Sequence, residues 1–215
     1  MGFSKRDVLF YILGGLFITN ALLGEIIGVK LITWGPYTLT MGVIPWPMVF
    51  IVTDLVNEYY GKEGVKKLTY LTVGLILYAF LIIYLSMLVP AAGISPVTDD
   101  VYNQVFGQSL WIIVGSVTAF LVSQLLDATV FWFFRAKTGS KMLWLRATGS
   151  TVISQLIDTF IVLGIAFWLP GKMTTDDFIS VSLTNYTYKL MVALGITPVI
   201  YVTHYLIDRF LSKHK

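Results

Sequence analysis

The sequence predicts an all-α membrane protein, a single domain over residues 1–215 with six transmembrane helices and both termini in the cytoplasm. Composition is the first observation behind this prediction: of 215 residues, 56% are hydrophobic and 13% charged, and the mean hydropathy is +0.78. Soluble domains carry roughly 25% charged residues, so lipid is expected to cover most of this protein. The other two observations are the lengths of the apolar runs and the placement of Lys and Arg between them.

Six apolar runs are long enough to cross a membrane, because about 20 helical residues span roughly 30 Å of hydrocarbon. The runs are residues 8–29, 43–60, 68–89, 110–134, 150–169 and 187–210. Helices are expected in all six, since backbone groups in lipid must be hydrogen-bonded within the segment. The runs lack the short polar–apolar alternation that is typical of the strands in membrane barrels.

Lys and Arg residues gather on one side of the predicted bundle. Twelve of the 15 lie there: Lys5, Arg6, Lys62, Lys66, Lys67, Arg135, Lys137, Lys141, Arg146, Arg209, Lys213 and Lys215. The other side holds only Lys30 and Lys172, and Lys189 lies inside the last run. Since positively charged loops stay in the cytoplasm, both termini are expected there, with the chain in a bacterial inner membrane.

Two segments on the opposite side have recognisable patterns. Residues 30–42 contain Gly-Pro between Thr, Tyr and Trp, which predicts a tight turn between two short extended arms. Residues 90–109 form the longest outer loop, and residues 101–106 at its end are expected to form a short surface helix.

The sequence also argues against several classes of protein. It has no cysteine, so it forms no disulfide and has no Cys-based metal site. Its basic residues are scattered between the apolar runs and form no continuous basic face, so nucleic acid is not an expected partner. It contains no nucleophile elbow, phosphate-binding loop or zinc-protease motif. We therefore expect a protein that is not an enzyme, with no catalytic residue, metal ligand or cofactor.

Six ionisable side chains lie inside the apolar runs, where each costs at least a few kcal/mol and is a functional candidate. They are Glu25, Asp54, Glu58, Asp127, Asp158 and Lys189. Counting about 1.5 Å per residue from the cytoplasmic boundary places Asp54, Asp127 and Asp158 near the midplane, about 12–14 Å deep. This common depth predicts a shared polar cavity, although a hydrogen-bonded network between helices would explain the same pattern. The same counting places Glu25 and Lys189 near the outer interface.

A short sequence recurs in the fourth and fifth runs, which are expected to be antiparallel. The first copy is Ser123-Gln124-Leu125-Leu126-Asp127, and the second is Ser154-Gln155-Leu156-Ile157-Asp158. At spacings i,i+3 and i,i+4, the Ser, Gln and Asp of each copy share one helix face. Inverted repeats surround the substrate in many transporters. An amide beside a carboxylate offers donors and acceptors together, which suits a nucleobase edge.

Three other residues keep two interpretations open. Glu58 is i,i+4 from Asp54, so one of the two carboxylates is expected to be protonated, paired or close to water, and Glu58 could equally be interfacial. Trp46 could belong to an aromatic belt at the interface or stack on a planar ligand. Lys189 could extend to the interface or contribute to a transport pathway.

Four groups of residues resemble the motifs of a known family. They are residues 42–47 (GVIPWP) with 53–63 (TDLVNEYYGKE); Phe106-Gly107, Ala119-Phe120, Ser123-Gln124 and Asp127; Arg146, Gly149-Ser150-Thr151, Ser154-Gln155 and Asp158-Thr159; and Tyr188-Lys189, Thr197-Pro198 and Tyr201. Together they resemble the queuosine precursor transporters, also called the vitamin uptake transporter family. The similarity extends from about residue 40 to 205. Asn20 and Lys30 match the family's first helix, whereas Glu25 has no counterpart.

The resemblance implies a bundle like the substrate-binding subunits of energy-coupling-factor vitamin transporters, working without their ATPase module. It implies uptake of 7-deazaguanine precursors of queuosine: 7-cyano-7-deazaguanine, 7-aminomethyl-7-deazaguanine or queuine. The expected partners are therefore a deazaguanine-like nucleobase and membrane lipid, and the oligomeric state stays open, a homodimer included.

The predicted substrate-binding residues form two groups. The primary candidates are Asp54, Gln124, Asp127, Gln155 and Asp158, and the secondary candidates are Asn20, Trp46, Asn57, Glu58, Arg146 and Lys189. One alternative is a vitamin-binding subunit that needs a separate energy-coupling module. The other is a small intramembrane enzyme that uses Asp54, Asp127 and Asp158 as metal ligands.

Overall fold

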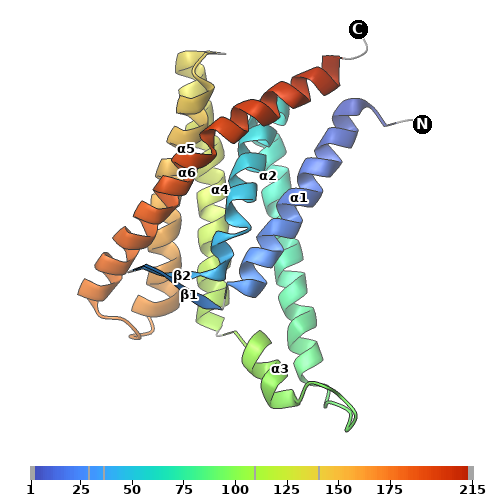
Figure 1. Cartoon of the computed structure of the whole chain (residues 1–215), viewed down its shortest axis with the longest axis vertical. Helices are drawn as coiled ribbons and strands as arrows, with labels where there is room; N and C mark the ends of the chain where they lie inside the picture. Colours follow the sequence, from blue (N-terminus) through green and yellow to red (C-terminus); the bar gives the residue numbers. More distant parts are fainter. Residues whose placement is uncertain (1–2, 29, 36, 109, 140, 213–215) are drawn as a thin grey trace.

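The computed structural model describes residues 3–212 apart from residues 29, 36, 109 and 140, so the predicted basic residues Lys213 and Lys215 lie outside it. Five helices in the described chain are long and apolar enough to cross a membrane. They are α1 (Lys5–Ile27), α2 (Trp46–Met87), α4 (Leu110–Thr138), α5 (Leu143–Leu163) and α6 (Thr175–Ser212). Figure 1 shows them together in one bundle, which confirms the predicted all-α membrane fold.

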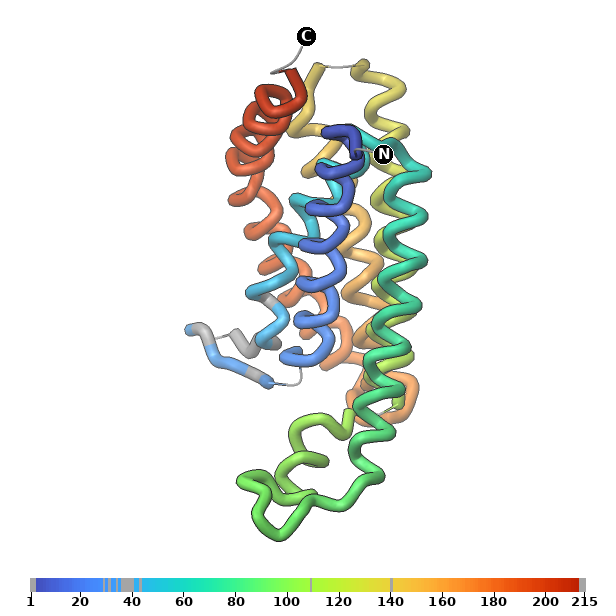
Figure 2. Tube along the Cα trace, turned by 90° about the vertical axis from the view of Figure 1, so that its right-hand side faces the viewer, coloured from blue at the N-terminus to red at the C-terminus, as the bar shows by residue number. Residues whose placement is uncertain are grey.

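Helix α2 contains both the second and the third predicted apolar runs. Its backbone leaves the helical conformation at Gly61, where φ is 74° and ψ is −179°. Side chains disfavour a positive φ, and glycine adopts it at little cost. Figures 1 and 2 show the consequence: the chain runs toward the end that carries the termini, turns, and runs back along the bundle. The helix assignment therefore gives five long helices where the sequence predicts six runs.

The predicted outer segments are both present. Strands β1 (Leu31–Trp34) and β2 (Tyr37–Thr40) pair antiparallel, with Leu31 opposite Thr40, and the short helix η1 (Met41–Val43) follows. Helix α3 (Asp99–Phe106) is the expected surface helix. Figure 1 shows the hairpin and α3 toward the end of the molecule opposite both termini.

The two ends of the chain lie at the same end of the bundle (Figure 1). The α4–α5 turn lies there as well, and two of its residues, Gly139 and Met142, have positive φ values of 61° and 58°. Helix α1 begins nearby at a capping box, in which Ser4 and Asp7 exchange hydrogen bonds of 3.0 and 3.1 Å. This grouping agrees with the sequence pattern that collects Lys and Arg on the side of the termini.

Small residues allow the closest helix contacts around the interior. A Cβ atom at Gly115 of α4 would lie 3.2 Å from both the Ala166 nitrogen and the Val162 oxygen. The close contact involves η2 (Gly164–Trp168), a π-helical turn that continues α5. Such turns often occur at functional sites. Elsewhere, large apolar side chains such as Leu81 (53% exposed) and Val202 (59%) face outward, as a lipid-covered surface requires.

Candidate functional site

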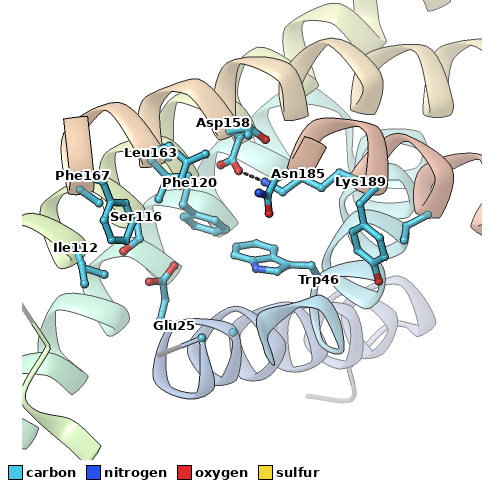
Figure 3. A pocket seen from close by; sticks show the side chains of 18 of the residues that line it. Glu25, Trp46, Ile112, Ser116, Phe120, Asp158, Leu163, Phe167, Asn185 and Lys189 are labelled. Atoms are coloured by element: carbon cyan, nitrogen blue, oxygen red, sulfur yellow. Dashed lines mark hydrogen bonds and ion pairs between the residues drawn. The ribbon is translucent and has the colours of Figure 1, made fainter. Parts of the chain in front are cut away.

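The structure contains a cavity of about 420 Å³ between the helices, in the half of the bundle farther from the termini. Its walls come from α1, the first part of α2, α4, α5, η2, α6 and Gln108 just before α4. Binding cavities for small molecules typically measure about 300–1,000 Å³ and combine apolar walls with a few polar groups. This cavity has that composition, and Figure 3 shows its polar groups on two facing walls.

One polar wall is an ion pair between α5 and α6. The Lys189 Nζ lies 2.6 Å from Asp158 Oδ2, and the two side chains are 24% and 14% exposed. Ser123 of α4 donates a hydrogen bond of 3.2 Å to the other oxygen, Asp158 Oδ1. Asn185 lies one turn before Lys189 and also lines the cavity, with one N–H given to the Val181 carbonyl at 2.9 Å. This wall therefore presents both signs of charge and an amide.

The facing polar wall centres on Glu25 of α1, which is 8% exposed. Its position is held by Gln108, whose Nε2 donates to the Glu25 carbonyl at 2.9 Å. The carboxylate points toward Ser116 (Figure 3). Among the described residues, no Lys or Arg nitrogen lies within 4.0 Å of it. With Asp158 and Lys189 offsetting each other, the cavity carries one surplus negative charge when Glu25 is ionised.

Aromatic rings lie between the two polar walls. Trp46 is nearly parallel to Phe50, with ring centroids 6.3 Å apart and planes at 22°. The ring centroids of Trp46 and Phe120 are 6.0 Å apart. In Figure 3, Phe120 lies between Glu25 and Asp158. Aromatic faces of this kind favour planar ligands, which can stack on them with their polar edges free.

The repeated pentapeptide forms a reciprocal pair of contacts between antiparallel helices. Ser123 of the first copy donates to Asp158 of the second at 3.2 Å, and Ser154 of the second donates to Asp127 of the first at 3.1 Å. The two copies are therefore related by an approximate two-fold exchange across the α4–α5 interface. Their surroundings differ, since Asp158 lines the cavity and Asp127 does not.

The prediction that Asp54, Asp127 and Asp158 share one cavity is wrong, because only Asp158 lines the cavity. Asp54 and Asp127 are 2% and 4% exposed and lie outside the cavity lining, in a separate polar layer. Gln124 belongs to this layer and accepts a hydrogen bond of 3.0 Å from Thr53. Gln155 is buried and is likewise absent from the lining. A common depth counted along separate helices does not specify which way the side chains point.

Three secondary candidates, Asn57, Glu58 and Arg146, lie toward the end of the bundle that carries the termini. Arg146 is 2% exposed, and its guanidinium contacts Glu58 at 2.9 Å and the carbonyls of Gly139 and Lys141 at 3.2 and 3.1 Å. Arg135 contacts Glu58 at 2.9 Å as well. Asn57 is fully buried, and its amide has no hydrogen-bond partner among the described residues. The Glu58 ion pairs join α2, α4 and α5 near the Gly61 turn.

Three of the predicted substrate-binding residues line the cavity: Trp46, Asp158 and Lys189. The last candidate, Asn20, is outside it and donates to the Leu16 carbonyl at 2.8 Å. Lys189 pairs with Asp158 and lines the cavity, in the half of the bundle farther from the termini. Its depth near the outer interface stays a prediction.

Sequence reasoning missed several lining residues and left Glu25 undecided. Asn185 lies four residues before Lys189, so a shared helix face could have identified it. Ser116 and Phe120 are also four residues apart on α4. Gln108 stands in a loop, where no periodicity indicates its direction.

An all-helical membrane protein that encloses a ligand-sized cavity with charged and aromatic walls is of the class that binds small molecules within the bundle. Comparisons with known proteins give the particular family. A family model described as "Putative vitamin uptake transporter" matches residues 40–203. A probable queuosine precursor transporter of Bacillus subtilis is 32% identical over 165 residues, covering 76% of this chain and 71% of that protein.

Two other relatives have similar descriptions. The queuosine precursor transporter of Escherichia coli is 25% identical, with 72% of this chain and 67% of that protein covered. A probable queuosine precursor transporter of Haemophilus influenzae is 25% identical, with 72% and 63% covered. No solved structure matches significantly. The chain belongs to the queuosine precursor transporter family, and it is a transporter rather than an enzyme.

Proposed function

We propose that this protein imports 7-deazaguanine precursors of queuosine across a bacterial inner membrane, without a separate ATPase module. The observation that carries the proposal is the cavity, in which aromatic faces lie between Glu25 and the Asp158–Lys189 pair (Figure 3). The names of the relatives supply the substrate class. The precursors differ in the group at position 7: a nitrile, an aminomethyl group or the larger substituent of queuine.

The chemistry of a deazaguanine fits these walls. Its planar ring can stack against Trp46 and Phe120. Its edge presents adjacent N–H donors beside a carbonyl, which a carboxylate and the Lys189 ammonium can meet. When Glu25 is ionised the cavity has one surplus negative charge, and the aminomethyl precursor, which carries a cationic amine, is then the best match. Adenine would place an unprotonated ring nitrogen against a carboxylate and a donor where the carbonyl should be.

We also propose six membrane crossings, with the termini in the cytoplasm. Support comes from the reversal of the chain at Gly61, which divides α2 into two segments that run in opposite directions (Figures 1 and 2). The first segment, residues 46–60, is only about 22 Å long. It therefore starts inside the membrane, beside the cavity, as the broken helices of other transporters do.

Cysteine labelling tests this orientation, since the natural chain contains no cysteine. Lys141 in the α4–α5 turn and Ala92 before α3 are both exposed. In intact cells, an impermeant maleimide should label Ala92→Cys and leave Lys141→Cys unlabelled until the cells are opened. If only Lys141→Cys were labelled in intact cells, the proposed orientation would be wrong and the opposite one would hold.

Calorimetry on the purified protein tests the substrate class. We expect 7-aminomethyl-7-deazaguanine to bind and adenine to bind about 30-fold to 10⁴-fold more weakly, because each of two buried mismatches costs roughly 1–3 kcal/mol. Equal affinity for adenine, or no binding of any deazaguanine, would refute the proposed substrate. Binding of a vitamin instead would favour a vitamin-binding subunit.

A further inference from the structure

Two carboxylates in the polar layer have no cation bound to them. Asp54 and Asp127 are 2% and 4% exposed, and no Lys or Arg nitrogen among the described residues lies within 4.0 Å of either. Asp54 Oδ1 and Asp127 Oδ2 have no hydrogen-bond partner in the described chain. Two ionised carboxylates in this setting would be strongly disfavoured, because burial in the membrane removes their hydration.

The two acids lie on helices that are in contact. Thr53, next to Asp54 on α2, donates at 3.0 Å to Gln124, which is one turn before Asp127 on α4. The charge of Asp127 is among those that act on Asp54. Asn57, fully buried and without a partner among the described residues, lies three residues after Asp54 on the same face of α2.

The charged groups considered around this pair come from α2, α4 and α5. Helix α2 also provides Glu58, α4 provides Arg135, and α5 provides Arg146. Both guanidinium groups are held by Glu58 at 2.9 Å. Helix α5 also offers Asp127 the hydroxyls of Ser150, Thr151 and Ser154. Three carboxylates thus face two guanidinium groups, and one bound proton would make the layer neutral.

The layer is connected to the cavity by the repeated pentapeptide. Ser154 donates to Asp127 at 3.1 Å, while Ser123, four residues before Asp127 on α4, donates to Asp158 at 3.2 Å. A movement of α4 against α5 would therefore change the hydrogen bonding of Asp127 and of the cavity residue Asp158 together. Two hydrogen bonds across the α4–α5 interface thus connect the layer residue Asp127 and the cavity residue Asp158.

We propose that Asp54 and Asp127 share one proton, and that this proton crosses the membrane with each substrate molecule. The proton enters from the outer side with the loaded cavity and leaves to the cytoplasm, so the transporter is a substrate–proton symporter. No bond of the substrate is made or broken. The inference rests on the proposed function only in that the chain transports a solute.

Infrared spectroscopy tests the shared proton without any substrate. The wild-type protein in lipid should show the carbonyl stretch of a protonated carboxylic acid at neutral pH, and it should disappear on titration to high pH. The same component of that band should be missing in both Asp54→Asn and Asp127→Asn, since either change leaves one carboxylate with no acid to share its proton. Asp100→Asn on the exposed helix α3 is the matched control and should keep it. A band unaffected by either substitution, or no band in wild type, would overturn the site.

Transport in proteoliposomes tests the coupling. With the outside acidic, wild-type protein should accumulate 7-aminomethyl-7-deazaguanine and acidify a pH-sensitive dye trapped inside. Asp127→Asn should lose at least 10-fold of this accumulation, whereas the control Asp100→Asn should keep it. Gradient-driven accumulation by Asp127→Asn at the wild-type level would refute symport. Absence of exchange by wild type would instead refute the proposed substrate, and the infrared result would still decide the proton site.

Misfolding is controlled by a second substitution. Asp127→Glu keeps the carboxylate and should retain the infrared band and at least part of the accumulation. If Asp127→Glu is folded and monodisperse but behaves like Asp127→Asn in both assays, a proton-binding role for this carboxylate is wrong.

Discussion

The cavity and the polar layer each contain the aspartate of one copy of the same pentapeptide, but the two aspartates have different partners. Asp158 meets Lys189 at 2.6 Å and lines the cavity, whereas Asp127 meets Ser154 and lies near Asp54. The local sequence is nearly the same in both places. What separates a substrate wall from a proposed proton site is the neighbouring helix: α6 brings a cation to one copy, and α2 brings a second acid to the other.

The largest effect is expected at the Asp158–Lys189 pair. Removing one partner of a buried ion pair leaves the other charge uncompensated, at a cost of about 3–5 kcal/mol. Asp158→Asn and Lys189→Met should therefore each reduce uptake of radiolabelled 7-aminomethyl-7-deazaguanine in cells about 100-fold or more. The double variant should be no worse than the poorer single variant, because both lose one interaction. Fully additive losses would show that the two side chains act separately.

A stability effect of comparable size is expected at Arg146, without an effect on binding chemistry. Arg146→Met removes one of the two guanidinium groups that hold Glu58, together with its hydrogen bonds to two carbonyls of the α4–α5 turn. A loss of about 3–5 kcal/mol would lower the melting temperature by roughly 6–20 °C. Thermal unfolding in detergent measures this change, and Lys141→Met on the exposed turn is the control. An unchanged melting temperature with lost binding would move Arg146 into the substrate site.

A selective effect is expected at Glu25. Glu25→Gln keeps the shape of the side chain but removes the surplus charge of the cavity. A hydrogen bond to a charged group contributes about 1.5–3 kcal/mol, so affinity for the aminomethyl precursor should fall about 10- to 150-fold. Affinity for the uncharged cyano precursor should change by less than about 3-fold. Calorimetry with both compounds compares them, and an equal loss for the two would assign Glu25 to the shared ring edge instead.

The smallest effect is expected from the aromatic ring of Trp46. Stacking contributes about 0.5–1.5 kcal/mol beyond burial, so Trp46→Leu should weaken binding roughly 2- to 13-fold, and Trp46→Phe less. The same calorimetric titration measures both variants. Wild-type affinity in Trp46→Leu would place the ring of the substrate elsewhere in the cavity.

Much of the fold could be predicted because it depends on local patterns. The apolar runs, the turn in residues 30–42 and the helix near residues 101–106 each follow from neighbouring residues. The repeat predicted that α4 and α5 present matching polar faces, and the reciprocal Ser–Asp contacts agree. The course of α6 required tertiary information. Counting residues assumes upright helices, but α6 has 38 residues, or about 57 Å, and lies obliquely.

The sequence also could not predict which polar residues line the cavity and which belong to the polar layer. Asp54, Asp127 and Asp158 have similar depth in separate runs, and only packing decides which of them meets Lys189. Gln108 occupies a loop position with no periodicity, and its contact with the Glu25 carbonyl spans 83 residues of sequence. Long-range contacts of this kind leave no local pattern.

The division between a substrate wall and a proton layer is tested most directly by calorimetry on two matched variants. Asp158→Asn and Asp127→Asn make the same chemical change in the two copies of one pentapeptide. With 7-aminomethyl-7-deazaguanine as ligand at fixed pH, Asp158→Asn should lose about 100-fold or more in affinity, and Asp127→Asn should stay within about 3-fold of wild type. The opposite order, or equal losses in both, would contradict the assignment of Asp158 to the substrate and Asp127 to the proton.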